Sequence, residues 1–161
     1  MIQLTQKERT LLEDQKKHEQ ICIEKYTNYS NQTQSPQLKQ LFQSYAAQEQ
    51  NHYDTVNQLL SGQVPNLNQS QQQSGGQRQN TANAAQSATN MQGAMADQSD
   101  ASLLNDMLMT EKYVSSTYDT AIFEFTDSNV RQALNHIQKE EQQHGEGIFN
   151  YMQSQGMYNP Q

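Results

Sequence analysis

The fold of this chain follows from two short stretches: AAQEQNH at residues 46–52 and QKEEQQH at residues 138–144. Each carries a histidine three residues after a glutamate, namely Glu49 with His52 and Glu141 with His144. Residues three apart on an α-helix share a face, with their Cβ atoms about 5–6 Å apart. Because carboxylates and imidazoles are metal ligands, two such pairs in one small chain predict helices that carry a metal site.

The two stretches belong to a longer internal match. His52 and His144 are 144 − 52 = 92 residues apart, and sliding the sequence by that offset aligns residues 11–60 with 103–152 without a gap. The alignment holds nine identities, at Leu11, Leu12, Asp14, Glu19, Tyr26, Gln40, Glu49, Gln50 and His52 with their counterparts. A match that includes the glutamates and histidines of interest predicts two copies of one helical hairpin.

Apolar residues recur at helical spacing in four segments, which predicts an all-α chain. The predicted helices run from Thr5 to about 31, from Ser35 to 62, from about 100 or 102 to 125, and from about 128 to 156. Residues 61–100 are rich in Gln, Ser, Asn and Gly, which is typical of flexible linkers, with a weak helix over 82–95 as the alternative. We therefore expect one domain made of a hairpin over 1–60, a linker or crossover over 61–100, and a hairpin over 101–155.

A glutamate interrupts the apolar face of each predicted helix, and a buried carboxylate must be protonated, hydrogen-bonded or bound to a cation. In an antiparallel hairpin, residues equally far from the turn are level with each other. The midpoints (19 + 49)/2 = 34 and (111 + 141)/2 = 126 both fall in predicted turns. Two hairpins packed together would therefore gather four glutamates and two histidines in one layer.

That layer has the ligand set of carboxylate-bridged dinuclear sites, in which two helices supply one Glu each and two supply Glu-x-x-His. Oxygen and nitrogen ligands suit iron or manganese. We predict a dinuclear iron or manganese site formed by Glu19, Glu49, His52, Glu111, Glu141 and His144. The alternative is a metal-free polar layer in which Glu, His and Tyr hydrogen-bond to one another. No residue is predicted to be catalytic.

Other chemically capable side chains lack this paired arrangement. His18 and His136 have no histidine 92 residues away and are expected at the surface, and the single Cys22 is expected to be a small buried apolar residue. Gly145 and Gly147 lie inside the last predicted helix and indicate either close approach of another backbone or a weakened helix end. We expect four tyrosines to lie in the core with their hydroxyl groups in contact with water: Tyr26, Tyr45, Tyr118 and Tyr151.

The composition restricts the possible partners. A net charge of −7 argues against nucleic acid and anionic membranes as partners. No apolar run approaches the ~20 residues of a membrane span, and residues 1–7 lack the apolar core of a signal peptide. One cysteine excludes an internal disulfide. We therefore expect synthesis in the cytoplasm.

Residues 110–113 read Thr-Glu-Lys-Tyr, Tyr118 follows, and residues 140–144 read Glu-Glu-Gln-Gln-His. In these features residues 100–158 resemble the spore coat protein F family of endospore-forming bacteria. The resemblance implies a ferritin-like antiparallel four-helix bundle, a place in the protein shell of the spore and no established catalysis. The layout also resembles rubrerythrins and other ferritin-like di-iron proteins, although their spacing would place the first carboxylates at Lys16 and Leu108. Either the hairpin turns are shorter here or the metal site is not intact.

The resemblance leads to a structural function as the first expectation. The protein would be made in the mother cell, deposited in the spore coat, and packed there with other coat proteins and with copies of itself as a homo-oligomer. The alternative is a di-iron or di-manganese protein that acts on peroxide or oxygen, or that buffers metal.

Overall fold

Four long α-helices form the fold in the part of the chain that the structure describes. The structure is a computed structural model that describes residues 2–65 and 91–158, with side chains of the second segment described from Asp100 onward. The helices are α1 (Gln6–Gln32), α2 (Pro36–Leu60), α3 (Met91–Ile122) and α4 (Ser128–Ser154). The predicted all-α chain and its four-helix bundle are confirmed. Among these helices, none is long and apolar enough to cross a membrane.

Local sequence signals account for the starts of three helices. Thr5 and Glu8 form the predicted capping box at the start of α1, with the Thr5 side chain and the Glu8 side chain each bound to the other residue's backbone N–H. Ser35 caps α2 with Pro36 in its first turn. Asp127 caps α4 by accepting hydrogen bonds from the first-turn N–H groups. The caps at Ser35 and Asp127 lie in the two tight turns, and they therefore help to fix the register within each hairpin.

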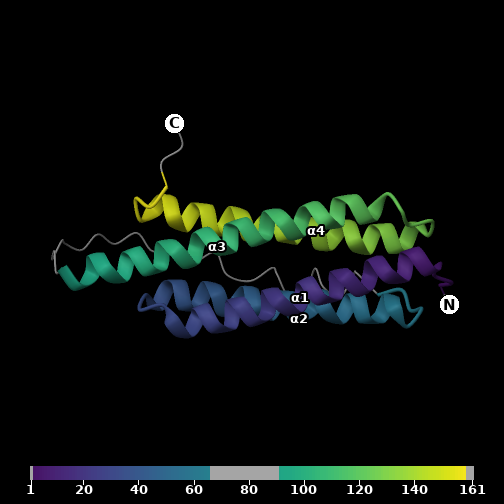
Figure 1. Ribbon diagram of the computed structural model, residues 1–161, viewed down its shortest axis with the longest axis horizontal. Helices are drawn as coiled ribbons and strands as arrows, with labels where there is room; N and C mark the ends of the chain where they lie inside the picture. The colour runs from purple at the N-terminus through teal and green to yellow at the C-terminus, as the bar shows by residue number, and fades with distance from the viewer. Residues whose placement is uncertain (1, 66–90, 159–161) are drawn as a thin grey trace.

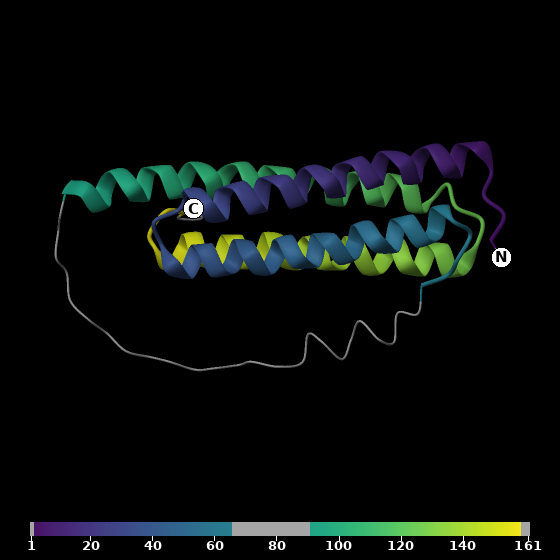
Figure 2. The ribbon, with the colours of Figure 1, turned by 90° about the horizontal axis from the view of Figure 1, so that it is seen from below.

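The helices are arranged as two antiparallel hairpins, α1 with α2 and α3 with α4, packed against each other (Figure 1). α1 lies beside α3 and α2 lies beside α4 (Figure 2). Both of these pairs are antiparallel. Lys7, near the start of α1, pairs with Glu124 after the end of α3, whereas Lys25, farther along α1, pairs with Asp106. Each helix therefore has two neighbours and faces a common interior.

The start of α3 differs from the sequence prediction. The helix was predicted from about residue 100 or 102, but it begins at Met91, and its first turns project beyond the rest of the bundle (Figure 2). The Gln- and Ser-rich composition of this stretch suggested a linker, yet Ala, Met and Gln are good helix formers. Residues 61–65 of the predicted linker follow the end of α2, whereas residues 66–90, with most of the alternative helix over 82–95, lie outside the described residues.

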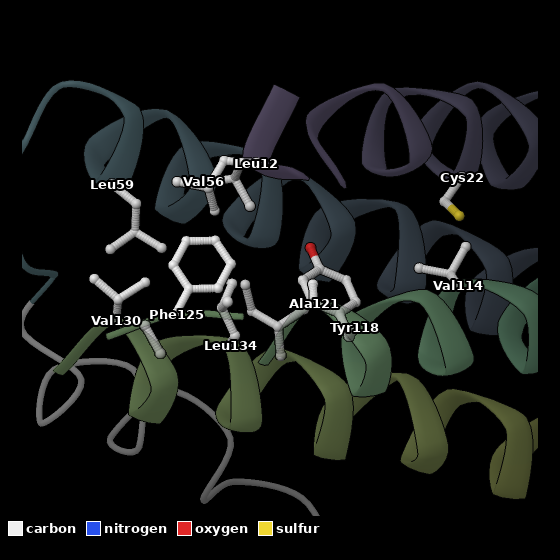
Figure 3. Packing of buried hydrophobic residues seen from close by; sticks show 12 residues of the cluster. Leu12, Cys22, Val56, Leu59, Val114, Tyr118, Ala121, Phe125, Val130 and Leu134 are labelled. Atoms are coloured by element: carbon white, nitrogen blue, oxygen red, sulfur yellow. The ribbon is translucent and has the colours of Figure 1, made fainter. Parts of the chain in front are cut away.

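The core consists of two apolar clusters. One cluster joins all four helices around Leu12, Val56, Phe125 and Leu134, with Phe125 between side chains of α2 and α4 (Figure 3). The second cluster, at the other end of the bundle, is built around Tyr26, Phe42, Leu104, Met107 and Ile148. The layer between them is polar, and it contains the residues that the sequence predicts as metal ligands.

Glycine within α4 makes room for a tyrosine. A Cβ atom on Gly147 would overlap the hydroxyl oxygen of Tyr45 and stand 3.1 Å from its Cζ. A Cβ atom on Gly145 would meet only ordinary contacts, at 3.8 Å from Leu108 and 4.0 Å from Glu111. The close approach at Gly147 therefore comes from a side chain on α2 rather than from a backbone.

Candidate metal centre

Six side chains from all four helices meet in the polar layer, and all six are buried. No residue of the set is more than 2% exposed: Glu19 on α1, Glu49 and His52 on α2, Glu111 on α3, Glu141 and His144 on α4. These are the six residues that the sequence predicts to meet. The midpoints calculated from the sequence therefore predicted correctly which carboxylates lie at the same height. The hairpin turns are short enough to bring Glu19 and Glu111 into the layer.

The six residues form two overlapping groups of potential ligands. One group is Glu19, Glu49, His52 and Glu141, and the other is Glu49, Glu111, Glu141 and His144. In each group, one ligand atom per residue can be chosen so that all lie within 4.8 Å of one another. Glu49 and Glu141 belong to both groups. A carboxylate shared in this way has one oxygen available for each of two neighbouring cations.

Both imidazole rings turn Nδ1 toward the carboxylates. His52 Nδ1 lies 3.1 Å from an oxygen of Glu49, 3.1 Å from one of Glu141 and 3.6 Å from one of Glu19. His144 Nδ1 lies 3.2 Å from Glu49, 3.5 Å from Glu111 and 3.5 Å from Glu141. The two rings are stacked with centroids 5.7 Å apart. Each ring therefore presents one nitrogen to three carboxylates.

The outer nitrogens of the rings have different partners. His52 Nε2 is 2.8 Å from Oε2 of Glu140, and His144 Nε2 is 2.5 Å from Oε1 of Gln48. Glu140 and Gln48 occupy positions 92 residues apart in the sequence. An Nε2–H group that donates to these oxygens leaves the Nδ1 lone pair directed inward, which is the arrangement that metal-binding histidines need.

Two buried tyrosines hold the outer carboxylates in place. Tyr26 Oη donates a hydrogen bond to Oε1 of Glu111, and Tyr118 Oη donates one to Oε1 of Glu19. Burial and the neighbouring glutamates raise the pKa of both phenols well above the ordinary value, so both are neutral donors. Their hydroxyls are therefore not in water, contrary to the sequence-based expectation for these two tyrosines.

Burial and neighbouring charges shift the pKa values of the groups in this layer in different directions. Burial and the charge of Glu141 raise the pKa of Glu19 and of Glu111 well above the usual value. Burial would also raise the pKa of Glu141, but hydrogen bonds from His144 and His52 hold it well below the usual value. Burial lowers the pKa of an imidazole, but the surrounding carboxylates outweigh it and raise the pKa of both His52 and His144.

Several ligand atoms in the layer have no hydrogen-bond partner within the described structure. They are Glu19 Oε2, Glu49 Oε1, Glu111 Oε2, Glu141 Oε2 and His144 Nδ1. A buried polar atom without a partner is destabilising by about 1–3 kcal/mol, so such atoms need an explanation. A metal-free polar layer explains the tyrosine and outer histidine contacts but satisfies these atoms only in part, because each imidazole has a single Nδ1 for the three carboxylates within 3.6 Å of it. A pair of cations would satisfy them, and the donor set therefore fits two ions that favour oxygen and nitrogen.

The remaining candidates lie outside this layer. His18 is partly buried and contacts Gln15 and Thr117, and His136 is partly buried beside Glu140. Cys22 is buried in the first apolar cluster, and burial raises the pKa of its thiol. Sequence reasoning missed the contacts of Gln48 and Glu140, although the offset of 92 residues relates these positions as it relates the ligands.

One of the comparisons with known proteins finds a match. Residues 99–161 match the family model described as the Coat F domain. The matched segment contains most of α3 and all of α4, and with them Glu111, Glu141 and His144. No match was found among curated proteins or among solved structures.

Proposed function

We propose, from the match of residues 99–161 to the Coat F domain family model, that the chain is a structural protein of the bacterial endospore coat. The family match is the observation that carries the proposal. Synthesis in the cytoplasm of the mother cell and deposition on the developing spore are part of it. So is packing with other coat proteins and with further copies of this chain.

Exposed apolar side chains support the packing part of this proposal. Met109, Tyr113 and Phe123 are 70%, 59% and 83% exposed, and all three lie on α3 or directly after it. Removing apolar surface from water is the main favourable contribution to protein association. These side chains therefore offer contact area to neighbouring molecules in a protein layer.

Localisation tests the structural role. We expect immunolabelling of sections of mature spores to place the protein in the coat layers, with no signal from spores that lack the gene. Labelling confined to the spore core would overturn the proposal. Extraction of isolated coats should release the protein together with other coat proteins.

The second candidate function is metal binding in a ferritin-like bundle that arose by duplication of a hairpin. The overlap of the two ligand groups at Glu49 and Glu141 favours it. In this proposal Glu19 and His52 would hold one ion and Glu111 and His144 the other, with Glu49 and Glu141 available to both. Iron or manganese suits this oxygen- and nitrogen-rich set. The bound ions would supply redox chemistry toward oxygen or peroxide, or would be held as stored metal.

The surrounding residues have defined parts in that proposal. Tyr26 and Tyr118 hold one oxygen of each outer carboxylate, which leaves the second oxygen facing the interior. Glu140 and Gln48 fix the planes of the two imidazoles. The two apolar clusters on either side exclude water from above and below the layer.

Metal analysis tests the second function. Protein produced with iron and manganese supplied should contain two ions per chain, located by anomalous scattering in the polar layer. The Glu49→Ala and Glu141→Ala double variant should lose both ions, because each ion loses two ligands. A Glu13→Ala and Glu146→Ala variant removes two exposed carboxylates and should keep both. Wild-type protein without metal, and with an ordered Glu/His/Tyr network, would exclude this function and leave the structural role untouched.

A further inference from the structure

A pocket on the surface between α3 and α4 reaches the polar layer. Its volume is about 470 Å³, and Glu111 and Glu141 are among the residues that line it. Both glutamates are buried, with 2% and 0% exposure, and each has one oxygen without a hydrogen-bond partner in the described structure. The pocket therefore extends from solvent to two of the residues proposed as ligands, whose unpartnered carboxylate oxygens are themselves covered.

Exposure decreases from the mouth of this pocket inward. Lys112, Asp119 and Gln142 are exposed at the mouth, whereas Ser115 and Gly145 are only partly exposed along the walls. Gly145 has no side chain. A Cβ atom added there would have Leu108 and Glu111 as its nearest neighbours, at 3.8 and 4.0 Å. Any larger side chain at Gly145 would therefore extend into the pocket near its carboxylate end.

The equivalent position in the other hairpin is filled. Sliding by 92 residues places Tyr53 at the position of Gly145, Ile23 at that of Ser115 and Lys16 at that of Leu108. The Lys16 ammonium lies over the Tyr53 ring, 5.2 Å from its centroid. A second pocket does lie between α1 and α2, but its lining includes neither Glu19 nor Glu49. The two hairpins therefore differ in access although their ligands correspond.

We propose that the α3–α4 pocket is the entrance through which divalent cations reach the Glu/His layer, and that Gly145 keeps this entrance open. This inference rests on the proposed metal centre. The route offers hydroxyl, amide and carboxylate oxygens in sequence from Ser116 and Asp119 to Glu111 and Glu141. Oxygen ligands of this kind replace the water molecules of a hydrated divalent ion one at a time. In this proposal the larger side chains at the equivalent positions of the first hairpin, Tyr53 and Ile23, close the corresponding route between α1 and α2.

The rate of metal uptake tests the entrance separately from the site itself. Co²⁺ is added to metal-free full-length protein, and its visible absorption is followed in time and at equilibrium. Gly145→Tyr introduces the side chain found at the equivalent position of the first hairpin. It should slow uptake at least about tenfold, the effect of about 1.4 kcal/mol added to the barrier. The number of ions bound at equilibrium should stay as in the wild type.

Two further variants keep the test decisive. Ser115→Ile narrows the pocket from α3 and should also slow uptake. It provides the test if Gly145→Tyr fails to fold. Asn150→Tyr adds the same side chain to an exposed position of α4 that does not line the pocket, and uptake should match the wild type. Wild-type uptake rates in folded Gly145→Tyr or Ser115→Ile protein would overturn the entrance while leaving the metal centre intact. Wild-type protein that binds no Co²⁺ would instead overturn the metal centre.

Discussion

Alanine at Gly145 and at Gly147 should change the stability of the protein in opposite directions. Both glycines lie inside α4, and replacing glycine by alanine in a helix interior stabilises by roughly 0.5–1 kcal/mol. At Gly145 the added methyl group meets only ordinary contacts, so Gly145→Ala should keep that gain. At Gly147 it overlaps the Tyr45 hydroxyl, and such overpacking costs about 1–3 kcal/mol.

The size of the effect follows from how Tyr45 is held. Its ring lies 4.3 Å from that of His144 and 5.6 Å from that of Tyr26, measured between centroids. The ring therefore cannot swing away from Gly147 without disturbing the polar layer. We expect Gly147→Ala to be less stable than Gly145→Ala by the overpacking cost alone, about 1–3 kcal/mol. For a chain of this length the difference corresponds to roughly 2–4 °C in Tm per kcal/mol.

Urea and thermal unfolding followed by circular dichroism measure this difference. Tyr45→Phe removes the overlapping oxygen, so adding it to Gly147→Ala should recover part of the lost stability, whereas adding it to Gly145→Ala should not. Equal stability of the two alanine variants would show that Tyr45 moves freely. The packing around His144 described above would then be wrong.

Three further predictions concern other contacts. Glu8 accepts hydrogen bonds from Thr5 and Thr126, which outweigh burial and lower its pKa, so Glu8→Gln should destabilise by about 1.5–3 kcal/mol at neutral pH. A carboxylate whose pKa is lowered by folding stabilises the protein above its unfolded pKa of about 4.5, so the stability difference between wild type and Glu8→Gln should shrink as the pH falls below that value. A stability difference that does not change with pH would argue against an ionised Glu8. If the metal centre exists, Glu140→Gln should weaken binding at the ion held by His52 by about 10–100-fold in a Co²⁺ titration, with little change at the second ion. Saturating Co²⁺ at a thousand times its Kd should raise the free energy of unfolding by about 4 kcal/mol for each ion bound, and no rise in Tm would contradict specific binding.

Much of the fold was predictable because its signals are local. Thr5, Ser35 and Asp127 mark helix starts through hydrogen bonds to residues two or three positions away, and the structure shows each of them. The meeting of the six buried Glu and His residues was also predictable, because a tight turn in an antiparallel hairpin fixes which residues are level. The offset of 92 residues then gave the corresponding positions in the second hairpin.

The parts that sequence reasoning missed depend on contacts between hairpins or on composition. The Gln- and Ser-rich stretch before Asp100 suggested a linker, yet α3 already begins at Met91. The bonds from Tyr26 and Tyr118 cross from one hairpin to the other, and their geometry depends on how α1 packs on α3. The pocket beside Gly145 depends on a missing side chain, whose effect is visible only when the neighbouring helix is in place.

The polar layer also has a consequence for the alignment of the bundle. Two hairpins with uniformly apolar contact faces would pack almost equally well after one slides past the other by one helical turn, about 5.4 Å. Here such a slip would set Met107 or Val114, which flank Glu111 by one turn, against Glu19 of the other hairpin. It would also break the tyrosine bonds to both outer carboxylates. A buried polar group that is satisfied in only one register selects that register, as single buried polar residues do in coiled coils. The Glu/His layer thus holds the two hairpins in one register, and it does so independently of any chemistry performed within it.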